Sequence, residues 1–279
     1  NSFTLCRMER ISTPRWNSIR SIYIIPMKAI VLSSGSKGNT TYIECNGTKI
    51  LIDLGNTCKY VKEKLSTLQI NAEDLDAILI THTHVDHVKG LKVFQKKYHT
   101  KVYLTEKMHE EIDYIDNYQI IDNHGDFQIN NLIIHVLKTS HDTNDSVGYV
   151  VEGEHKSVVY ITDTGYINQK YFPLLTNKEI YIMESNHDIE MLNHSSYPFK
   201  VRQRILGDKG HLSNYDSARY LSTFIGENTK YILLAHLSHE NNTEDLAYET
   251  LNNRLKENQQ KVEKIIITKQ DEESEEVFV

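Results

Sequence analysis

The six residues 82–87 read His-Thr-His-Val-Asp-His and bring four side chains that can bind metal into one short segment. They follow the apolar run 77–81, which is typical of a strand, and they precede a segment with helical spacing. His82 and His84 are two positions apart, so at the end of an extended strand their side chains point the same way and can bind one ion. The aspartate and the last histidine lie past the bend and face a second position. Since imidazole and carboxylate suit borderline divalent ions, the spacing predicts a metal site.

Four side chains cannot complete two metal sites, so further ligands have to come from other strand ends. Three polar residues follow apolar, strand-like runs in this way: His141 after 132–137, Asp163 after 158–162 and His236 after 231–235. A histidine or an aspartate that is buried at such a point needs a polar partner or an ion. These three residues are therefore the candidates that complete a centre of two divalent ions.

Short β-branched runs and helical segments alternate along the chain. The predicted strands are 29–32, 41–45, 49–54, 77–81, 101–104, 132–137, 147–152, 157–162, 179–184, 230–235 and 261–268. The predicted helices are 59–68, 88–98, 105–114, 199–206, 214–225 and 245–258. Blocks of strands followed by helices occur twice, which predicts an α/β fold with two packed sheets covered by helices. Since no linker separates the two halves, residues 27–270 are expected to form one domain.

The two ends of the chain differ in charge. Residues 1–26 show no sustained hydrophobic period and carry four arginines and one acid, whereas Met27 opens a strand-like run. We expect 1–26 to be an extension outside the domain, a misassigned start or a cloning scar, with an extra helix or edge strand as the alternative. The apolar part, 21–25, is too short for a secretory signal. Residues 271–279 contain five acids and predict a solvated acidic tail.

The composition excludes several classes of protein. With 279 residues, 39% hydrophobic and 25% charged, the chain is typical of a soluble globular protein and not of a disordered or fibrous one. No apolar run approaches the roughly 20 residues that span a bilayer, which argues against a membrane protein. The three cysteines form no Cys-x-x-Cys pair, so we expect a reducing cytoplasm. The net charge of −7 argues against long-range, non-specific attraction to nucleic acid, but a locally positive site remains compatible with it.

The order of the candidate ligands resembles that of the metallo-β-lactamase superfamily, and the resemblance covers 27–268. It implies an αββα sandwich of two mixed β-sheets flanked by helices. It also implies that His82, His84 and His141 bind one metal, that Asp86, His87 and His236 bind the other, and that Asp163 bridges the two. Asp53, in Leu-Ile-Asp-Leu-Gly, matches an aspartate that supports the ligands in that family. A carboxylate that caps a turn is the alternative for Asp53.

Five further strings, at 33–39, 140–149, 184–188, 210–214 and 234–242, are similar to the YycJ/WalJ (VicX) group of metallohydrolases. This resemblance implies a 5′-to-3′ DNA exonuclease, supported by manganese and linked by gene neighbourhood to a two-component system. His and Asp ligands tolerate zinc, manganese and iron, so the sequence alone does not select the metal.

Two divalent ions held close together can share a hydroxide and clamp a scissile phosphate. We therefore expect phosphodiester hydrolysis with the metal-bridging hydroxide as nucleophile and Asp86 orienting it. His211 is the candidate for contacting the phosphate or protonating the leaving group, with a helix-capping or core histidine as the alternative. His187, Asp188 and Asn214 are candidates for supporting a metal or the substrate, and a packing role is the alternative for them.

Basic residues in the second half could contact a DNA substrate. Lys200, Arg202 and Arg204 fall in one predicted helix, and Lys209 follows it. Near the site they can follow a phosphate backbone, although a solvated helix face explains them equally well. The loop 33–39 can bring backbone N–H groups and a lysine to a phosphate, but its glycine spacing is only a weak signal.

Two other functions agree with the same residues. One is hydrolysis of a small molecule such as an ester, a thioester or a cyclic nucleotide. The other is a regulatory protein that keeps its metal site for structure alone. A complete set of seven ligands argues against the regulatory protein, because an open and charged site is costly to keep for stability.

Overall fold

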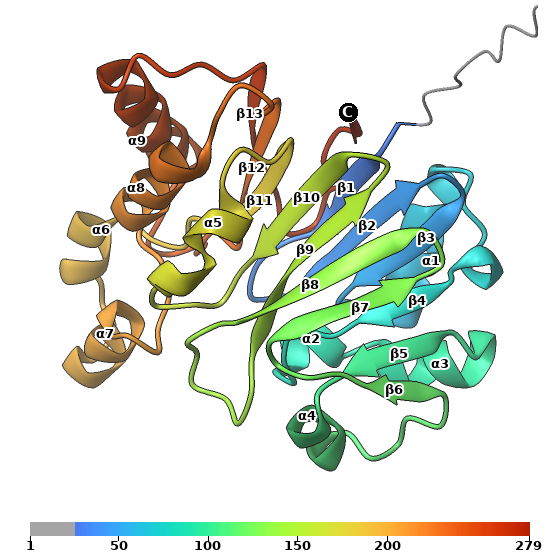
Figure 1. Cartoon of the computed structure of the whole chain (residues 1–279). Coiled ribbons are helices and arrows are strands. Elements are labelled where there is room, and N and C mark those ends of the chain that lie inside the picture. The colour runs from blue at the N-terminus through green and yellow to red at the C-terminus, as the bar shows by residue number, and fades with distance from the viewer. Residues whose placement is uncertain (1–25) are drawn as a thin grey trace, which may run out of the picture.

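The computed structural model describes residues 26–279, in which two seven-stranded sheets lie face to face with helices on their outer sides (Figure 1). This is the predicted αββα sandwich. The expectation for 1–26 lies outside the described residues, apart from Pro26.

Each sheet consists of a set of antiparallel strands and a set of parallel ones. The first sheet has the order β14 (Val277–Phe278), β1 (Lys28–Ser33), β2 (Thr40–Cys45), β3 (Thr48–Ile52), β4 (Ala77–Leu79), β5 (Lys101–Leu104) and β6 (Tyr118–Ile120). The second has the order β13 (Lys264–Ile267), β12 (Tyr231–Ala235), β11 (Ile180–Glu184), β10 (Lys156–Ile161), β9 (Val147–Gly153), β8 (Leu132–Lys138) and β7 (Gly125–Ile129). The strands from β3 to β6 and from β10 to β13 are parallel, so the carboxyl ends within each set lie at the same edge of the sheet.

Helices cover both outer faces (Figure 1). Those in the first half are α1 (Cys58–Thr67), α2 (Val85–Val88), α3 (Leu91–Tyr98) and α4 (Glu106–Glu111). Those in the second half are α5 (Phe172–Leu175), α6 (Ile189–Asn193), α7 (Phe199–Leu206), α8 (Asn214–Phe224) and α9 (Glu244–Glu257), and single 3-10 turns occur at Ala72–Asp74 and Gln169–Tyr171. Across residues 26–279, no helix is both long and apolar enough to cross a membrane.

The inner faces of the two sheets share one hydrophobic core. It contains fully buried side chains from both sheets, among them Ile43 and Ile50 from the first and Val151 and Val158 from the second. The Tyr149 hydroxyl donates a 2.6 Å hydrogen bond to the Ile80 carbonyl and so links the two sheets through a polar contact. A second cluster lies between the second sheet and the helices α8 and α9. The two sheets, and the helices that pack on the second sheet, are therefore held together next to the edge at which the candidate residues lie.

The last residues differ from the solvated tail that the sequence predicts. Val277 pairs with Ala29 in β1 and is 1% exposed, and Met27 and Val279 exchange two backbone hydrogen bonds of 3.0 Å. The apolar Val-Phe-Val ending explains the difference, because it adds an edge strand to the sheet, while lysines such as Lys64 and Lys264 pair with the acids before it.

Candidate metal centre

Five polar residues lie at or just after the carboxyl ends of parallel strands and meet between the two sheets. They are Asp53 after β3, His82 after β4, Asp163 after β10, Glu184 at the end of β11 and His236 after β12. None of the five is more than 5% exposed. Ligand sites in open α/β sheets characteristically lie at this edge, because the loops after the strands converge there.

The segment 82–87 is held by the loops on either side of it. The backbone N–H of Asn39 donates to the Asp86 carbonyl, and that of Leu54 donates to the His87 carbonyl, both at 2.8 Å. Gly55 makes this approach possible, because a Cβ at that position would lie 1.6 Å from the Asp86 carbonyl oxygen. The position of this segment is therefore fixed by backbone contacts.

The structure brings the seven predicted ligands together. Their ligand atoms form groups within 4.8 Å of one another, namely His82, His84 and His141; Asp86, His87 and His236; His82, His87 and Asp163; and Asp163, Glu184, His211 and His236. The first two groups have the same members as the two sets implied from the resemblance. Asp163 belongs to two of these groups, one with His82 and His87 and one that includes His236.

Asp163 is the centre of this cluster. One carboxylate oxygen lies 3.2 Å from His87 Nε2, and the other lies 3.5 Å from His236 Nδ1, 3.6 Å from His211 Nδ1 and 3.7 Å from His141 Nε2. Burial would raise the pKa of Asp163, but His236 and His87 hold that pKa well below its ordinary value. The carboxylate is therefore ionised and available to a cation.

Buried atoms without partners indicate that the cluster can accept metal ions. His82 Nε2 and His236 Nε2 are buried and have no hydrogen-bond partner within residues 26–279. Buried polar atoms are normally paired, so such atoms mark a place for an ion. Burial is also the main cause that lowers the pKa of His82 well below its ordinary value, which keeps the imidazole in the neutral form that a metal requires. The residues present fit divalent metal binding.

Asp53 supports the cluster from beneath. It is 0% exposed, and its Oδ2 lies 2.7 Å from His87 Nδ1 and 2.7 Å from the Thr81 hydroxyl, while its Oδ1 accepts the Thr81 N–H at 2.8 Å. A carboxylate that binds one ring nitrogen of a histidine fixes the ring and leaves the other nitrogen for a ligand. In this position Asp53 orients His87.

Glu184 is not among the predicted site residues, yet it is fully buried beside Asp163. Its Oε1 lies 2.8 Å from His211 Nδ1 and 3.0 Å from His236 Nδ1, and its Oε2 accepts the N–H groups of Leu212 and Thr164 at 3.0 and 3.1 Å. Burial would raise the pKa of Glu184, but His211 opposes this and the net direction is downward. An acid at the end of an apolar strand is the same signal that identified Asp163, and it was present here as well.

His211 lines the cavity next to the cluster. Its alternative role as a helix cap does not apply, because the N-cap of α8 is Ser213, whose hydroxyl accepts the Asp216 N–H. Burial lowers the pKa of His211, yet Glu184 outweighs burial and the pKa is raised above its ordinary value. Since Nδ1 faces Glu184, the other ring nitrogen is left for a substrate.

The structure does not place the other three candidate residues among the clustered ligands. Asp188 caps α6 by accepting the Met191 N–H at 2.9 Å. Asn214 belongs to a buried polar network, where it bonds to the Ser185 hydroxyl at 2.7 Å. His187 is 1% exposed, and its carbonyl accepts the Asn214 N–H at 2.8 Å. Its ring belongs to none of the candidate groups, and both ring nitrogens are buried without a hydrogen-bond partner among residues 26–279.

The cluster lies at the base of a cavity of about 450 Å³. The cavity is lined by His84, Asp86, His141, Asp163, His211 and His236, and also by Lys37, Tyr197, Arg204, His239 and Gln270. The second set is polar, so the cavity combines a metal-binding base with groups that can bind a charged substrate.

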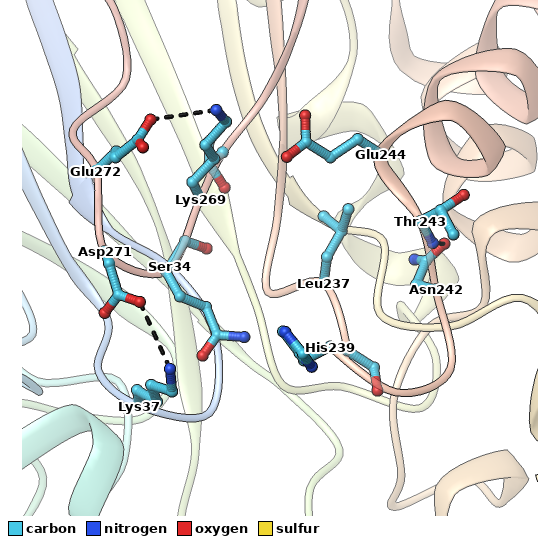
Figure 2. A pocket seen from close by; sticks show the side chains of 13 residues that line it. Ser34, Lys37, Leu237, His239, Asn242, Thr243, Glu244, Lys269, Asp271 and Glu272 are labelled. Atoms are coloured by element: carbon cyan, nitrogen blue, oxygen red, sulfur yellow. Dashed lines mark hydrogen bonds and ion pairs between the residues drawn. The ribbon is translucent and has the colours of Figure 1, made fainter.

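A second cavity of about 320 Å³ adjoins the first and shares Lys37, Leu237 and His239 with it (Figure 2). Figure 2 shows Lys37 beside Asp271, 3.5 Å from its carboxylate, while Glu244 lies on the far side of the cavity. Carboxylates therefore line this cavity, which makes it a poor site for a phosphate and leaves the metal cluster as the place for one.

Comparison with known proteins agrees with this geometry. The sequence profile of the beta-lactamase superfamily domain matches residues 48–234. The chain belongs to the metallo-β-lactamase superfamily. It is 37% identical to exodeoxyribonuclease WalJ of Streptococcus pneumoniae (strain D39) over 244 residues, which cover 83% of this chain and 89% of WalJ. It is 34% identical to exodeoxyribonuclease YycJ of Bacillus anthracis over 233 residues, which cover 81% of this chain and 88% of YycJ.

The solved structures show the same metallo-β-lactamase fold at low sequence identity. YhfI from Bacillus subtilis, a metallo-β-lactamase fold protein, matches with a TM-score of 0.72 and 18% identity. The match covers 91% of this chain and all of YhfI. Metallo-β-lactamase membership and the predicted fold are thus both confirmed.

Replacing Asp53 with asparagine tests whether the Asp53 carboxylate orients His87. We expect Asp53→Asn to weaken metal affinity by about 10- to 100-fold, because the amide no longer holds His87 with a charged acceptor. Metal titration by isothermal calorimetry measures the change. Asp76→Asn is the matched control, since Asp76 accepts the Lys49 N–H far from the centre. Unchanged affinity in Asp53→Asn would contradict the orienting role.

Proposed function

We propose that this chain is a metal-dependent exodeoxyribonuclease that removes nucleotides from DNA in the 5′-to-3′ direction. The observation that carries the proposal is the convergence of seven His and Asp side chains at the base of one cavity. The similarity to WalJ and YycJ over most of the chain supports DNA as the substrate.

Two divalent ions, of zinc, manganese or iron, fit this proposal. The first would be held by His82, His84 and His141, the second by Asp86, His87 and His236, with Asp163 facing both. Bound ions would supply Lewis-acid stabilisation to the reacting phosphate. Asp86 also lines the cavity, where its carboxylate can orient the attacking water.

Two basic residues at the cavity can bind the phosphate. The side chains of Lys37 and Arg204 are 64% and 61% exposed and pair with Asp271 and Asp142. Exposed ion pairs contribute little to stability, so either side chain can exchange its partner for a phosphate oxygen. Arg204 presents a planar fork that suits a phosphodiester.

His211 is the proposed proton donor to the leaving oxygen. Its Nδ1–H donates to Glu184 at 2.8 Å, and in the charged ring its Nε2 carries a second proton, which can be donated into the cavity. Glu184 stabilises the charged imidazole and fixes its orientation. This pair gives the enzyme a proton donor that is distinct from the three histidines proposed to hold the first ion.

An assay of strand cleavage tests the proposal. The protein, supplied with Mn²⁺ or Zn²⁺, is incubated with single-stranded DNA, duplex DNA and RNA labelled at either end, and with small ester and thioester substrates. We expect stepwise release of nucleotides from the 5′ end of DNA. Activity confined to the esters would overturn the nuclease, and release from the 3′ end would overturn the direction.

The proposal also includes a single domain and a reducing compartment. The shared core of both sheets supports a single domain over 27–270. Within residues 26–279 the thiols of Cys45 and Cys58 form no disulfide, which supports a reducing compartment such as the cytoplasm.

A further inference from the structure

Helix α7 is exposed along its whole length. None of its eight residues is buried, and it includes the exposed apolar side chains Phe199 at 63% and Leu206 at 46%. Figure 1 shows α6 and α7 together, outside the two sheets and away from the helices that cover the first sheet. A helix normally buries one face, so a helix of this kind indicates a surface that something else contacts.

The exposed residues of α7 form one face. At 100° per residue, Phe199, Lys200, Gln203 and Arg204 lie on the same side. The half-buried residues lie on the other, where the Arg202 guanidinium donates to the Asn193 carbonyl at the end of α6. Arg202 therefore holds α7 against α6, while Lys200 and Arg204 remain available to a ligand.

This face is basic in an acidic protein. Its two charged side chains, Lys200 and Arg204, are both basic, whereas the whole chain carries a net charge of −7. Helix α7 itself contains no acid. The charge and the exposed aromatic ring together fit a single nucleic-acid strand, which offers phosphates to the cations and bases to the ring.

The same face continues into the catalytic cavity. Arg204 and Ile205 line that cavity, and the Ile205 carbonyl accepts the N–H of His211 at 3.0 Å. Arg204 also pairs with Asp142, the neighbour of His141 in the chain. A strand whose end reaches the metal cluster can therefore pass directly onto α7.

We infer that the exposed face of α7 binds the DNA single strand that extends from the reacting end. The inference rests on the proposed nuclease and adds the surface that holds its substrate. Lys200 contacts a phosphate beyond the cleaved linkage, Arg204 contacts the one nearest the cavity, and the Phe199 ring stacks on a base.

The double variant Phe199→Ala/Lys200→Ala tests this surface. We expect its Kd for a labelled 20-nucleotide DNA strand, measured by fluorescence anisotropy at 4 °C without added metal, to rise about tenfold. The slope of log Kd against log salt should fall by about 0.7, the value for one phosphate contact on a single strand. With metal, KM for the strand should rise by a similar factor, while hydrolysis of bis(p-nitrophenyl) phosphate changes less than twofold.

Tyr248→Ala/Lys256→Ala is the matched control, since it removes an exposed aromatic ring and a lysine from α9, neither of which lines the catalytic cavity. A Kd within twofold of wild type in the α7 variant, or an equal loss in the control, overturns the inference. If the wild-type protein cleaves DNA but the α7 variant binds the strand with an unchanged Kd, the inference about α7 is wrong and the proposed nuclease stands. If strand binding depends on α7 but no DNA is cleaved, the proposed nuclease is wrong and the binding surface stands.

Discussion

Asp163→Ala should reduce DNA hydrolysis by at least about a thousandfold, since the charge stabilisation that bound metals provide is worth several kcal/mol. Asp163 contacts His87, His141 and His236, which belong to both proposed metal positions. Removing its carboxylate takes away the negative charge that faces both ions. We therefore expect metal content to fall together with activity, for DNA and for bis(p-nitrophenyl) phosphate alike.

Metal content by inductively coupled plasma mass spectrometry and initial rates on both substrates measure this effect. Asp145→Ala is the matched control, because Asp145 is also a buried aspartate, 5% exposed, but its carboxylate bonds to Asn123 outside the cluster. The control is expected to keep its metal and most of its activity. An Asp163→Ala protein with a tenth or more of wild-type activity and full metal content would contradict the central role of this residue.

The strands that build the centre could be predicted because they are apolar, β-branched and buried on both faces. Two strands that were not predicted, β6 and β7, lack this signal. The three residues of β6 are all exposed, and β7 is largely exposed, so neither carries an apolar run. The predicted helix 88–98 corresponds to α3, which begins only after Gly90, where a Cβ would lie 2.2 Å from the Asn56 carbonyl oxygen, and the short helix α2 before it was not predicted. Such a contact between distant segments is not visible in a local pattern.

At the site, too, contacts between distant segments decide which single residues belong to the cluster. His187 and Glu184 occupy one short string, yet only Glu184 reaches the cluster. Residue type and strand position do not tell which way a side chain points once the strand has ended. Direction depends on the next contact, which for the segment after β11 is a bridge between His187 and Ser213. The ligands of 82–87 could be predicted because their spacing alone fixes their relative directions.

His211→Ala is expected to lower kcat for DNA by about 100- to 10,000-fold, the usual contribution of a general acid. His211 contacts Glu184 and Asp163 and shares a candidate group with them and His236, but it belongs to neither set of residues proposed to hold an ion, so metal content should remain at the wild-type level. The effect should disappear for bis(p-nitrophenyl) phosphate, because nitrophenolate leaves without a proton. Rates on both substrates and the metal content of the same sample measure these three expectations.

The dependence on the leaving group separates His211 from Asp163, whose loss should affect both substrates. His239→Ala is the control for the removal of a cavity histidine, since His239 lines the same cavity but belongs to none of the candidate metal groups. We expect it to change kcat by less than threefold. If His211→Ala loses metal, or loses equal activity on both substrates, His211 acts in holding the centre together and another group must protonate the leaving oxygen.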